Sequence, residues 1–347
     1  MTAPDRISAL LQTQAGYNTG EPEGHIHFDS FDPYLEFGEV DLPAPASTQV
    51  VVEMTMSAVN PSDLHFLKGE YGQPREQGKP AGFEGVGTVV AAGDDDYATS
   101  LVGQRVSFVA TASGTWATHA ITEAMMCIPM PDKVSDPNAA GFIVNPLTAA
   151  AMFEQAREMG SPGIVLTAGA SQVSKFIIAL CRDHDMSSIA IVRRDVHNEV
   201  LTDLGATTIL NQTADDFDAQ LKAALKEHKP TLFIDAVVDD VSTQIFNAMG
   251  NKSNWLVYGS LSPDVPPMAN PGSFVFQQKV IRGFWLTPWL MGAPMDERLR
   301  VFGEVQDRFG DGRWNTDVGA TVALPDVMGS LAETLKDPRG KVFLTPM

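Results

Sequence analysis

The chain contains little cysteine. Its 347 residues include only Cys127 and Cys181. Two cysteines cannot build a disulfide framework, and they exclude a structural zinc lobe with four cysteine ligands. Neither stands in an arrangement of basic neighbours that suggests a reactive thiolate, and Cys181 lies in an apolar helical pattern. We therefore expect both to be packed side chains.

Basic residues are also scarce. The chain has 24 Lys and Arg against 43 Asp and Glu, which gives a formal net charge of −19. Contacts to nucleic-acid phosphates need clustered Lys and Arg, so this composition argues against a nucleic-acid partner. A surplus of negative charge keeps a surface soluble and unassociated, which is the simplest account of it.

Long apolar runs are missing as well. No stretch approaches the roughly 20 apolar residues that a membrane-spanning helix needs, and the first thirty residues lack a cationic segment followed by an apolar run. A hydrophobic content of 44% with 19% charged residues is ordinary for a globular protein. We expect a cytoplasmic protein with two domains, each large enough to bury its own core.

The first part of the chain, to about residue 138, has a β-rich pattern. Short segments rich in β-branched residues alternate with Gly, Pro and Asp clusters, which is typical of a small barrel-like domain. The predicted strands are 50–59, 85–93, 104–109 and 116–121. From about residue 294 we expect the chain to rejoin this domain, with a helix, a strand and a helix over 295–309, 318–324 and 325–335.

The middle of the chain alternates between strands and helices. The predicted strands are 164–167, 189–192, 207–210, 232–237 and 255–259, and the predicted helices are 149–159, 173–181, 198–204 and 217–227. Alternation at this spacing indicates βαβ units and a parallel sheet that is covered on both faces. The predicted fold class is α/β, a doubly wound Rossmann sheet domain beside a β-rich domain.

The first crossover of the middle region is a candidate dinucleotide site. Residues 168–174 (AGASQVS) follow a strand and open a helix. Small residues let the backbone approach a pyrophosphate, and a helix start offers N–H groups and the positive end of a dipole. Two positions that are commonly Gly hold Gln172 and Ser174, and a plain β-to-α turn is the alternative. The predicted cofactor contacts are Ala170, Ser171, Gln172 and Val173, with Tyr258 and Gly259 from the end of a later strand.

The end of the next strand bears on the choice of cofactor. Sites selective for NAD place Asp or Glu there, whereas NADP sites accommodate the extra phosphate with Arg. Here the strand ends in Arg193 and Arg194, two guanidinium groups in an otherwise acidic chain. We therefore predict NADP(H) as the cofactor. The alternative is a pair of solvated surface arginines.

Two segments of the first domain have the layout of the zinc-binding segments of alcohol dehydrogenases, but without the ligands. They are residues 60–65 (NPSDLH) and 82–87 (GFEGVG). Zinc-dependent members usually have Cys where Asn60 stands and His where Phe83 stands. An amide oxygen and a benzene ring cannot replace thiolate and imidazole as zinc ligands. We expect no catalytic metal, which favours reduction of an activated double bond or a quinone over alcohol oxidation.

The sequence resembles the zinc-independent branch of the medium-chain dehydrogenase/reductase superfamily, and within it the NADPH-dependent 2-enoyl thioester reductases and quinone oxidoreductases. The matching segments are 58–64, 68–72, 114–116, 145–149, 283–289 and 340–342. The resemblance implies a GroES-like catalytic domain formed by residues 1–138 and 294–347 and a Rossmann dinucleotide-binding domain formed by residues 139–293. It also implies an active site in the cleft between them and a homodimer.

The resemblance further implies site residues. Tyr71 matches the proton donor of the reductases, and a phenol is a reasonable donor to a carbanion that forms at the α-carbon. Asn60 would shape the site through hydrogen bonds. The alternative for Tyr71 is a ring packed in a loop with a solvated hydroxyl. Phe284, Trp285 and Trp289 would line a substrate pocket, although they could equally belong to the core or to a dimer interface.

Three functions remain open from the sequence. The first is an NADPH-dependent reductase of α,β-unsaturated carbonyl compounds, including enoyl thioesters, and the second is an NADPH:quinone oxidoreductase. The third is a cofactor-binding protein without turnover, which the glycine-poor turn and Asp239-Asp240 would favour. Because the chain is acidic, an acidic carrier protein would dock less readily than a free acyl-CoA, an enone or a quinone.

Overall fold

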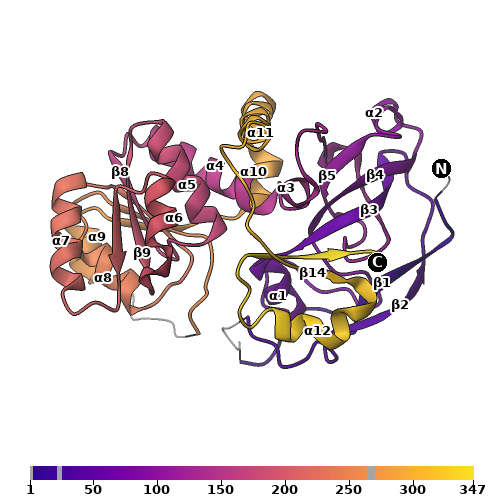
Figure 1. The fold of residues 1–347 in the computed structure, drawn as a ribbon, viewed down its shortest axis with the longest axis horizontal. Helices are drawn as coiled ribbons and strands as arrows, with labels where there is room; N and C mark the ends of the chain where they lie inside the picture. Colours follow the sequence, from indigo (N-terminus) through magenta and orange to yellow (C-terminus); the bar gives the residue numbers. More distant parts are fainter. Residues whose placement is uncertain (1–2, 22–25, 264–269) are drawn as a thin grey trace. The chain divides into compact units, whose positions relative to one another are not determined.

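The computed structural model describes residues 3–21, 26–263 and 270–347 (Figure 1). The chain divides into two compact units, which we describe separately. The first unit is built from residues 3–21, 26–144 and 306–347, and the second from the described residues between 145 and 305. The sequence places the corresponding changes at 138 and 293. An α/β fold with a β-rich unit and a parallel-sheet unit confirms the predicted fold class.

The first unit is organised around one large sheet. Its strand order is β14-β15-β3-β4-β5-β7, and β6 also pairs with β3. The strands are β3 (Gln49–Val59), β4 (Glu84–Ala92), β5 (Arg105–Val109), β6 (His119–Glu123), β7 (Cys127–Pro129), β14 (Val318–Ala323) and β15 (Lys341–Thr345). A separate hairpin consists of β1 (Arg6–Gln12) and β2 (Leu35–Asp41). Because β15 pairs with β3, the C-terminal segment completes the sheet that the first segment begins.

Short helices cover the sheet of the first unit. They are α1 (Pro61–Leu67), α2 (Asp96–Ser100), α3 (Asp136–Ala140) and α12 (Val327–Thr334), with 3₁₀ turns at Ala124–Met126 and Leu324–Asp326. One core cluster lies where α1, α12 and β15 meet, and it includes Leu64, Leu331 and Leu344, each exposed by 4% or less. This cluster fixes α1, which begins directly after Asn60, against the C-terminal strand. The C-terminal segment of this unit therefore supports the segment that begins at Asn60.

The second unit is a parallel sheet of six strands in the described residues. Its order is β10-β9-β8-β11-β12-β13 and every pairing is parallel. The strands are β8 (Gly163–Leu166), β9 (Ser187–Val192), β10 (Thr208–Asn211), β11 (Leu232–Asp235), β12 (Asn254–Val257) and β13 (Val280–Gly283). In chain order this is 3-2-1-4-5-6, the order of doubly wound dinucleotide-binding domains. The order reverses between β8 and β11, which is where such sheets bind ligands.

Helices connect the strands of the second unit. They are α4 (Val144–Glu158), α5 (Gln172–Asp183), α6 (Asn198–Asp203), α7 (Phe217–His228), α8 (Asp240–Ala248), α9 (Pro271–Val275), α10 (Leu286–Gly292) and α11 (Met295–Gly310), with a 3₁₀ turn at Asp195–His197. α4 begins and α11 ends in the first unit. Phe217 of α7 and Phe246 of α8 pack with Phe233 and Trp255 on one face of the sheet. Alternate strand residues such as Ile164 are just as buried, so both faces are covered.

No helix in the described residues is both long enough and apolar enough to cross a membrane. Strand β13 and helix α10 do not follow the strand and helix patterns used for the sequence prediction. β13 alternates poorly because Val280, Arg282 and Gly283 are all exposed, and α10 buries no residue. β13 is an edge strand of the parallel sheet, where side chains are only partly covered.

Candidate active-site residues

The turn between β8 and α5 has the backbone shape expected of a phosphate-binding turn. α5 begins at Gln172, and the Ser171 side chain caps it by accepting a hydrogen bond from the Ser174 N–H at 3.2 Å. Ala168 has a φ of +45°, a conformation that places the next residue against β9. The Gly169 N–H donates to the Ile191 carbonyl at 2.8 Å, and a Cβ at Gly169 would lie 3.0 Å from that oxygen. A small residue is therefore required here.

Hydroxyl groups occupy the turn where glycine is common. Ser174 is 1% exposed, and the Ser171 and Ser174 side chains hydrogen-bond each other at 3.1 Å. The Tyr258 hydroxyl hydrogen-bonds both serines, and burial raises the pKa of this phenol. The structure thus brings Tyr258, which the sequence places at the end of a distant strand, onto the predicted cofactor turn. Gly259 follows it, with Ala236 as its nearest neighbour.

Positive charge collects at the end of β9. Arg193 and Arg194 follow the strand and are exposed, and neither has an ion pair or hydrogen bond with any residue that the structure describes. Burial lowers the pKa of His197, and the charges of Lys175 and Arg194 lower it further. Lys175 lies in the first turn of α5. The sequence analysis missed Lys175 and His197, although a basic residue in that helix turn is a usable signal.

These residues fit a phosphate-bearing dinucleotide. The N-terminus of α5, a helix of 12 residues, carries the positive end of the helix dipole, which favours a phosphate. Arg193 and Arg194 are available to a further phosphate. The residues predicted as cofactor contacts therefore lie at the carboxyl ends of the parallel strands. Tyr258 joins them through the arrangement of the sheet, which the sequence does not show.

A buried aspartate ties together three strand ends at this edge. Asp235 is fully buried at the end of β11 and accepts the Thr167 hydroxyl and, at 2.9 Å, the indole N–H of Trp255. The Ala236 N–H donates to the Thr167 hydroxyl at 3.0 Å. β8, β11 and β12 are thus fixed beside the point where the strand order reverses. The sequence predicts Asp235 in a strand but not its hydrogen bonds with Thr167 and Trp255.

Val238, Asp239 and Asp240 follow β11. The Asp239 side chain caps α8 by accepting from the Ser242 N–H at 2.9 Å and from the Ser242 hydroxyl at 3.1 Å. This carboxylate is used by the helix start, while Asp240 is exposed. Val238 has a φ of +60°, which is unfavourable for a β-branched residue. The position therefore stores backbone strain close to the predicted cofactor turn.

Replacing Val238 by Gly is expected to stabilise the second unit by about 0.5–1 kcal/mol. Glycine adopts the left-handed conformation without the steric cost that the valine side chain adds. Urea unfolding of both proteins measures the change. Val237→Gly is the matched control: Val237 is not among the residues with positive φ, so the same substitution there should destabilise the protein. Destabilisation by both variants would contradict strain at Val238.

In the first unit, Asn60 belongs to a buried polar cluster. Asn60 and Glu84 are each 1% exposed, and the Asn60 amide N–H donates to the Glu84 carboxylate at 2.9 Å. The Asn60 amide oxygen accepts from the Lys341 ammonium. The second Glu84 oxygen accepts the N–H groups of Ile143 and Val144 at 3.0 and 2.8 Å. Both polar atoms of the Asn60 side chain are therefore engaged inside the unit, as a group that shapes its surroundings would be.

The same cluster contains a second carboxylate. Asp63, also 1% exposed, accepts the N–H of Asn60 at 2.8 Å and the N–H of Phe83 at 2.9 Å. Burial raises the pKa of Asp63 to about 7, and the nearby charge of Glu84 adds to the rise. Burial likewise raises the pKa of Glu84 and lowers that of Lys341. One ammonium thus faces two buried carboxyl groups.

Tyr71 lies against the residue that replaces a metal ligand. Its ring is half-buried, and the centroids of Tyr71 and Phe83 are 5.2 Å apart with an interplanar angle of 36°. The centroid of Phe66 of α1 also lies 5.1 Å from that of Phe83. The structure therefore brings the predicted proton donor next to Phe83, which the sequence predicts to stand in place of a zinc ligand. Phe83 and Asp63 link Tyr71 to Asn60, because Asp63 accepts the N–H groups of both Phe83 and Asn60.

The loop that carries Tyr71 is held by Arg75. This side chain is 7% exposed and donates to the carbonyls of Gly16 at 2.9 Å and Leu67 at 3.1 Å. Gly69 has a φ of +73°, and a Cβ there would lie 2.6 Å from the Arg75 guanidinium. Gly69 therefore allows a tight backbone turn against Arg75. The sequence analysis did not identify Arg75 as a support of this loop.

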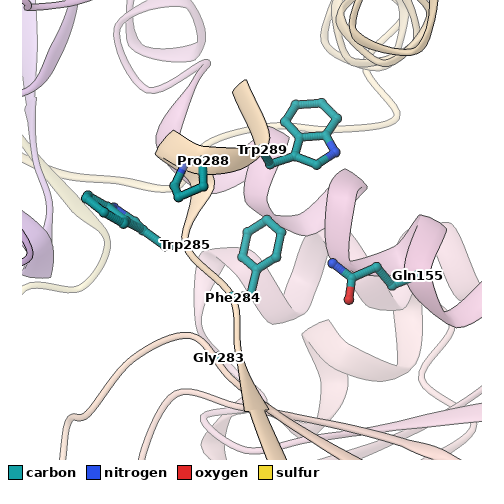
Figure 2. A pocket seen from close by; sticks show the side chains of 6 residues that line it. All are labelled: Gln155, Gly283, Phe284, Trp285, Pro288 and Trp289. Atoms are coloured by element: carbon teal, nitrogen blue, oxygen red, sulfur yellow. The ribbon is translucent and has the colours of Figure 1, made fainter. Parts of the chain in front are cut away.

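The three aromatic residues predicted to form a substrate pocket line a hollow in the second unit. The pocket has a volume of about 500 Å³ and is lined by Gln155, Gly283, Phe284, Trp285, Pro288 and Trp289 (Figure 2). In that view, Phe284 and Gln155 lie on one side and the Trp285 indole lies on the other. Trp285 is 39% exposed, and none of the three aromatic side chains is fully buried.

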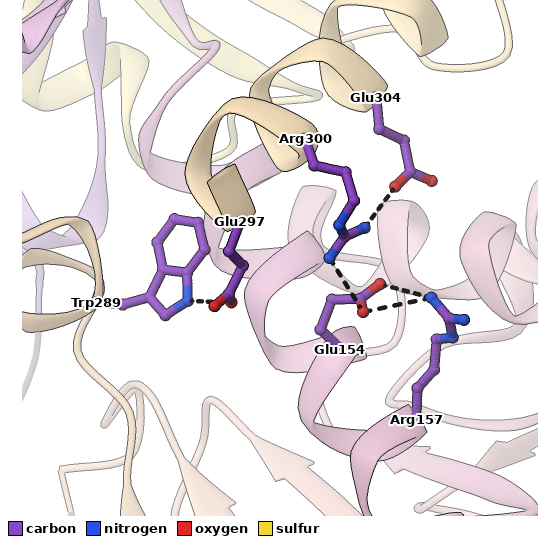
Figure 3. A network of polar contacts seen from close by, with 6 residues as sticks. All are labelled: Glu154, Arg157, Trp289, Glu297, Arg300 and Glu304. Atoms are coloured by element: carbon purple, nitrogen blue, oxygen red, sulfur yellow. Dashed lines mark hydrogen bonds and ion pairs between the residues drawn. The ribbon is translucent and has the colours of Figure 1, made fainter. Parts of the chain in front are cut away.

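A polar network stands beside this pocket. Glu154 of α4 forms ion pairs with Arg157 at 3.0 Å and with Arg300 of α11 at 3.3 Å (Figure 3). The Trp289 indole N–H donates to Glu297 of α11 at 3.3 Å. Partly exposed pairs of this kind add little stability individually. Together they connect α4, α10 and α11, which hold Gln155 and Trp289 on the pocket wall.

The remaining candidate groups carry no reactive arrangement in the part of the chain that the structure describes. No group of three or more His, Cys, Asp or Glu side chains is placed to hold a metal ion there. Cys127 and Cys181 are buried, as predicted for packed residues. Burial raises the pKa of Cys127 to about 12 and raises that of Cys181 as well, so both thiols stay protonated.

Comparison with known proteins gives relatives for the whole chain. The family described as "Alcohol dehydrogenase GroES-like domain" matches residues 46–132. A crystal structure from Mesorhizobium loti, of a protein provisionally assigned as an NADPH:quinone reductase, is 44% identical, covers 100% of both chains and has a TM-score of 0.93. The bovine mitochondrial enoyl-[acyl-carrier-protein] reductase is 27% identical over 320 residues, which cover 90% of this chain and 84% of the relative.

A third likeness concerns the fold. A complex of the Candida tropicalis 2-enoyl thioester reductase Etr1p with NADP and crotonyl-CoA is 22% identical and has a TM-score of 0.79. It covers 98% of this chain and 99% of that one. These relatives, the 3-2-1-4-5-6 sheet and the GroES-like match confirm the resemblance seen in the sequence. The chain belongs to the medium-chain dehydrogenase/reductase superfamily.

Proposed function

We propose that the protein is an NADPH-dependent reductase of activated carbon–carbon double bonds, in enoyl thioesters or other α,β-unsaturated carbonyl compounds, and that it works without zinc. The observation that carries the proposal is the contact between Tyr71 and Phe83. A phenol lies against the position that supplies a metal ligand in zinc-dependent members, so an acid stands where those enzymes would hold a Lewis acid. The names of the bovine and Candida tropicalis relatives support the same chemistry.

In this proposal the second unit holds the cofactor. Ala170, Ser171, Gln172 and Val173 would contact the pyrophosphate, with Tyr258 and Gly259 beside them and Arg193 and Arg194 on the 2′-phosphate. Bound NADPH supplies the hydride that the β-carbon of the substrate receives. Ser171 and Tyr258 hold the turn in shape through their hydroxyl hydrogen bonds. Arg193 and Arg194 follow β9 directly, where NAD-selective sites carry Asp or Glu, which favours the phosphorylated cofactor.

In the first unit, Tyr71 would donate its phenolic proton to the α-carbon as negative charge develops there. Its half-buried position lets solvent return the proton. Asn60 contacts no substrate in this proposal: it holds Glu84 and Lys341 in place below the site. Phe284, Trp285 and Trp289 would receive the apolar part of the substrate, with the Gln155 amide as a polar group on the same wall.

A quinone reductase is the second candidate. The 44%-identical protein from Mesorhizobium loti favours it, and aromatic walls with one amide also suit a planar ring that carries carbonyl oxygens. Quinone reduction would tolerate the loss of Tyr71.

A homodimer and a cytoplasmic location stay predictions. Light scattering of the purified protein tests the first, and detection of the native protein in cell fractions tests the second.

The test is oxidation of NADPH by the purified protein with short enoyl-CoAs, enones and quinones, with NADH in parallel. Turnover of enoyl thioesters or enones with NADPH preferred is the expected result. Activity with quinones alone would replace the first candidate by the second. Tight NADPH binding without oxidation on any acceptor would leave a cofactor-binding protein without turnover.

Replacing Arg193 and Arg194 by Ala is expected to weaken NADPH binding at least about 100-fold while leaving NADH binding nearly unchanged. Each arginine lost removes charge-assisted hydrogen bonds to a phosphate, which are worth about 1.5–3 kcal/mol apiece. Fluorescence titration with both nucleotides measures the effect. Arg182→Ala is the control, because that arginine is partly exposed but already paired with Asp183. An equal loss for NADH and NADPH would contradict a 2′-phosphate role for the pair.

A further inference from the structure

We propose that Phe83 is a positioning residue that holds the phenol of Tyr71 for proton transfer. The inference rests on the proposed function, because it presupposes that Tyr71 is the proton donor. It extends that function by assigning a role to the ring that stands in place of a metal ligand. Phe83 would act on the reaction only through Tyr71.

The backbone of Phe83 is fixed on both sides. Its N–H donates to the buried Asp63 carboxylate at 2.9 Å, and its carbonyl accepts the Ala110 N–H at 2.8 Å. Gly82 before it has a φ of +92°, and a Cβ there would lie 2.2 Å from the Trp116 ring. Trp116 is fully buried and its indole N–H donates to the Ala58 carbonyl at 3.2 Å. The Phe83 ring therefore projects from a backbone with little freedom.

The ring of Phe83 contacts two other aromatic rings. Phe66, which is 6% exposed, lies 5.1 Å from it at an interplanar angle of 56°. Tyr71 covers it at 5.2 Å, in the range for favourable aromatic pairs. Phe83 therefore contacts both a buried ring of helix α1 and the ring of the proposed donor. Arg75 fixes the backbone of the loop, and the Phe83 ring contacts the Tyr71 ring directly.

Ring position matters for a proton donor. Proton transfer requires the phenol oxygen within hydrogen-bond reach of the reacting carbon, and a displacement of about 1 Å can cost 100-fold in rate. An aromatic pair contributes about 0.5–1.5 kcal/mol beyond the area it buries. Without the Phe83 ring, Tyr71 would occupy more rotamers and spend less time in the productive one. The rate would then fall while binding of the cofactor would not change.

The experiment compares Phe83→Leu, Phe83→Tyr and Tyr71→Phe with the double variant that carries Phe83→Leu and Tyr71→Phe. For an enoyl-CoA or enone that the wild type reduces, Phe83→Leu is expected to lower kcat about 10-fold, with the KM for NADPH unchanged. Phe83→Tyr, which keeps a six-membered ring, should restore most of kcat. In the Tyr71→Phe background, Phe83→Leu should have almost no further effect, because no phenol is left to position.

Phe31→Leu controls for lost core packing. Phe31 is fully buried in the same unit and stacks on Phe28, so this variant should lose thermal stability while retaining kcat. Two results would overturn the positioning role without touching the proposed function: a large loss in Tyr71→Phe with none in Phe83→Leu, or equal losses for Phe83→Leu in both backgrounds. An unchanged enoyl rate in Tyr71→Phe would instead remove the proposed proton donor, and the positioning role with it.

Discussion

Replacing Tyr71 by Phe is expected to lower kcat for enoyl or enone reduction by at least about 100-fold. A positioned general acid typically contributes 10²–10⁴-fold, and the substitution removes the acidic proton while keeping the ring. The ring contact with Phe83 should survive, because it involves carbon atoms and not the hydroxyl. NADPH binding should not change, since the predicted cofactor contacts lie in the other unit. Steady-state kinetics with saturating NADPH and a fluorescence titration with NADPH measure the two quantities.

The control for this prediction is Tyr97→Phe. Tyr97 lies in the same unit, is 46% exposed and belongs to helix α2, away from the residues of the proposed site. It should leave both enoyl reduction and NADPH binding unchanged. Quinone reduction, if the wild type shows any, should persist in Tyr71→Phe. Full enoyl turnover by Tyr71→Phe would mean that solvent or another group supplies the proton.

The parallel-sheet unit could be predicted from the sequence because its strands are buried on both faces. A run such as 189–192 is apolar throughout, and turn residues separate it from the next helix, so helix and strand patterns do not overlap. The predicted helix 217–227 corresponds to α7, Phe217–His228, for the same reason. Strand β13 was missed, since an edge strand with exposed residues lacks a buried face. Strands β1 and β2 were missed too, because their hairpin partners are separated by a long segment.

The candidate site was less accessible to prediction. The missing zinc ligands at Asn60 and Phe83 are visible in the sequence, but the contacts that replace them are not. Lys341 bonds Asn60 across 281 positions of the chain, and only the pairing of β15 with β3 brings them together. The Phe83–Tyr71 contact likewise depends on how a loop folds back on β4. Sequence patterns report periodic burial, whereas these contacts join single residues of irregular segments.

Lys341 provides the second large expected effect. Replacing it by Met should lower the free energy of unfolding of the first unit by about 3–5 kcal/mol at pH 8. The ammonium is the positive charge that faces the buried carboxyl groups of Glu84 and Asp63, and its removal leaves them without a counter-charge. It also leaves the Asn60 amide oxygen without its donor. Urea unfolding followed by circular dichroism measures the loss. Lys336→Met is the control, since Lys336 forms an exposed pair with Glu333 and should cost less than about 1 kcal/mol.

The effect of Lys341→Met should depend on pH in a defined direction. Burial raises the pKa of Asp63 to about 7 in the folded protein, from an ordinary value of 3.8. Between these values the folded state holds more protons than the unfolded state, so the contribution of Asp63 to stability falls as the pH rises. Removing Lys341 removes a charge that lowers the pKa of both Asp63 and Glu84, so both carboxyl groups should stay protonated to higher pH. The stability difference between Lys341→Met and the wild type should therefore be smaller at pH 5, where Asp63 is neutral and needs no counter-charge, than at pH 8. A difference that is equal at both values would show that Lys341 stabilises the unit by packing and not by its charge.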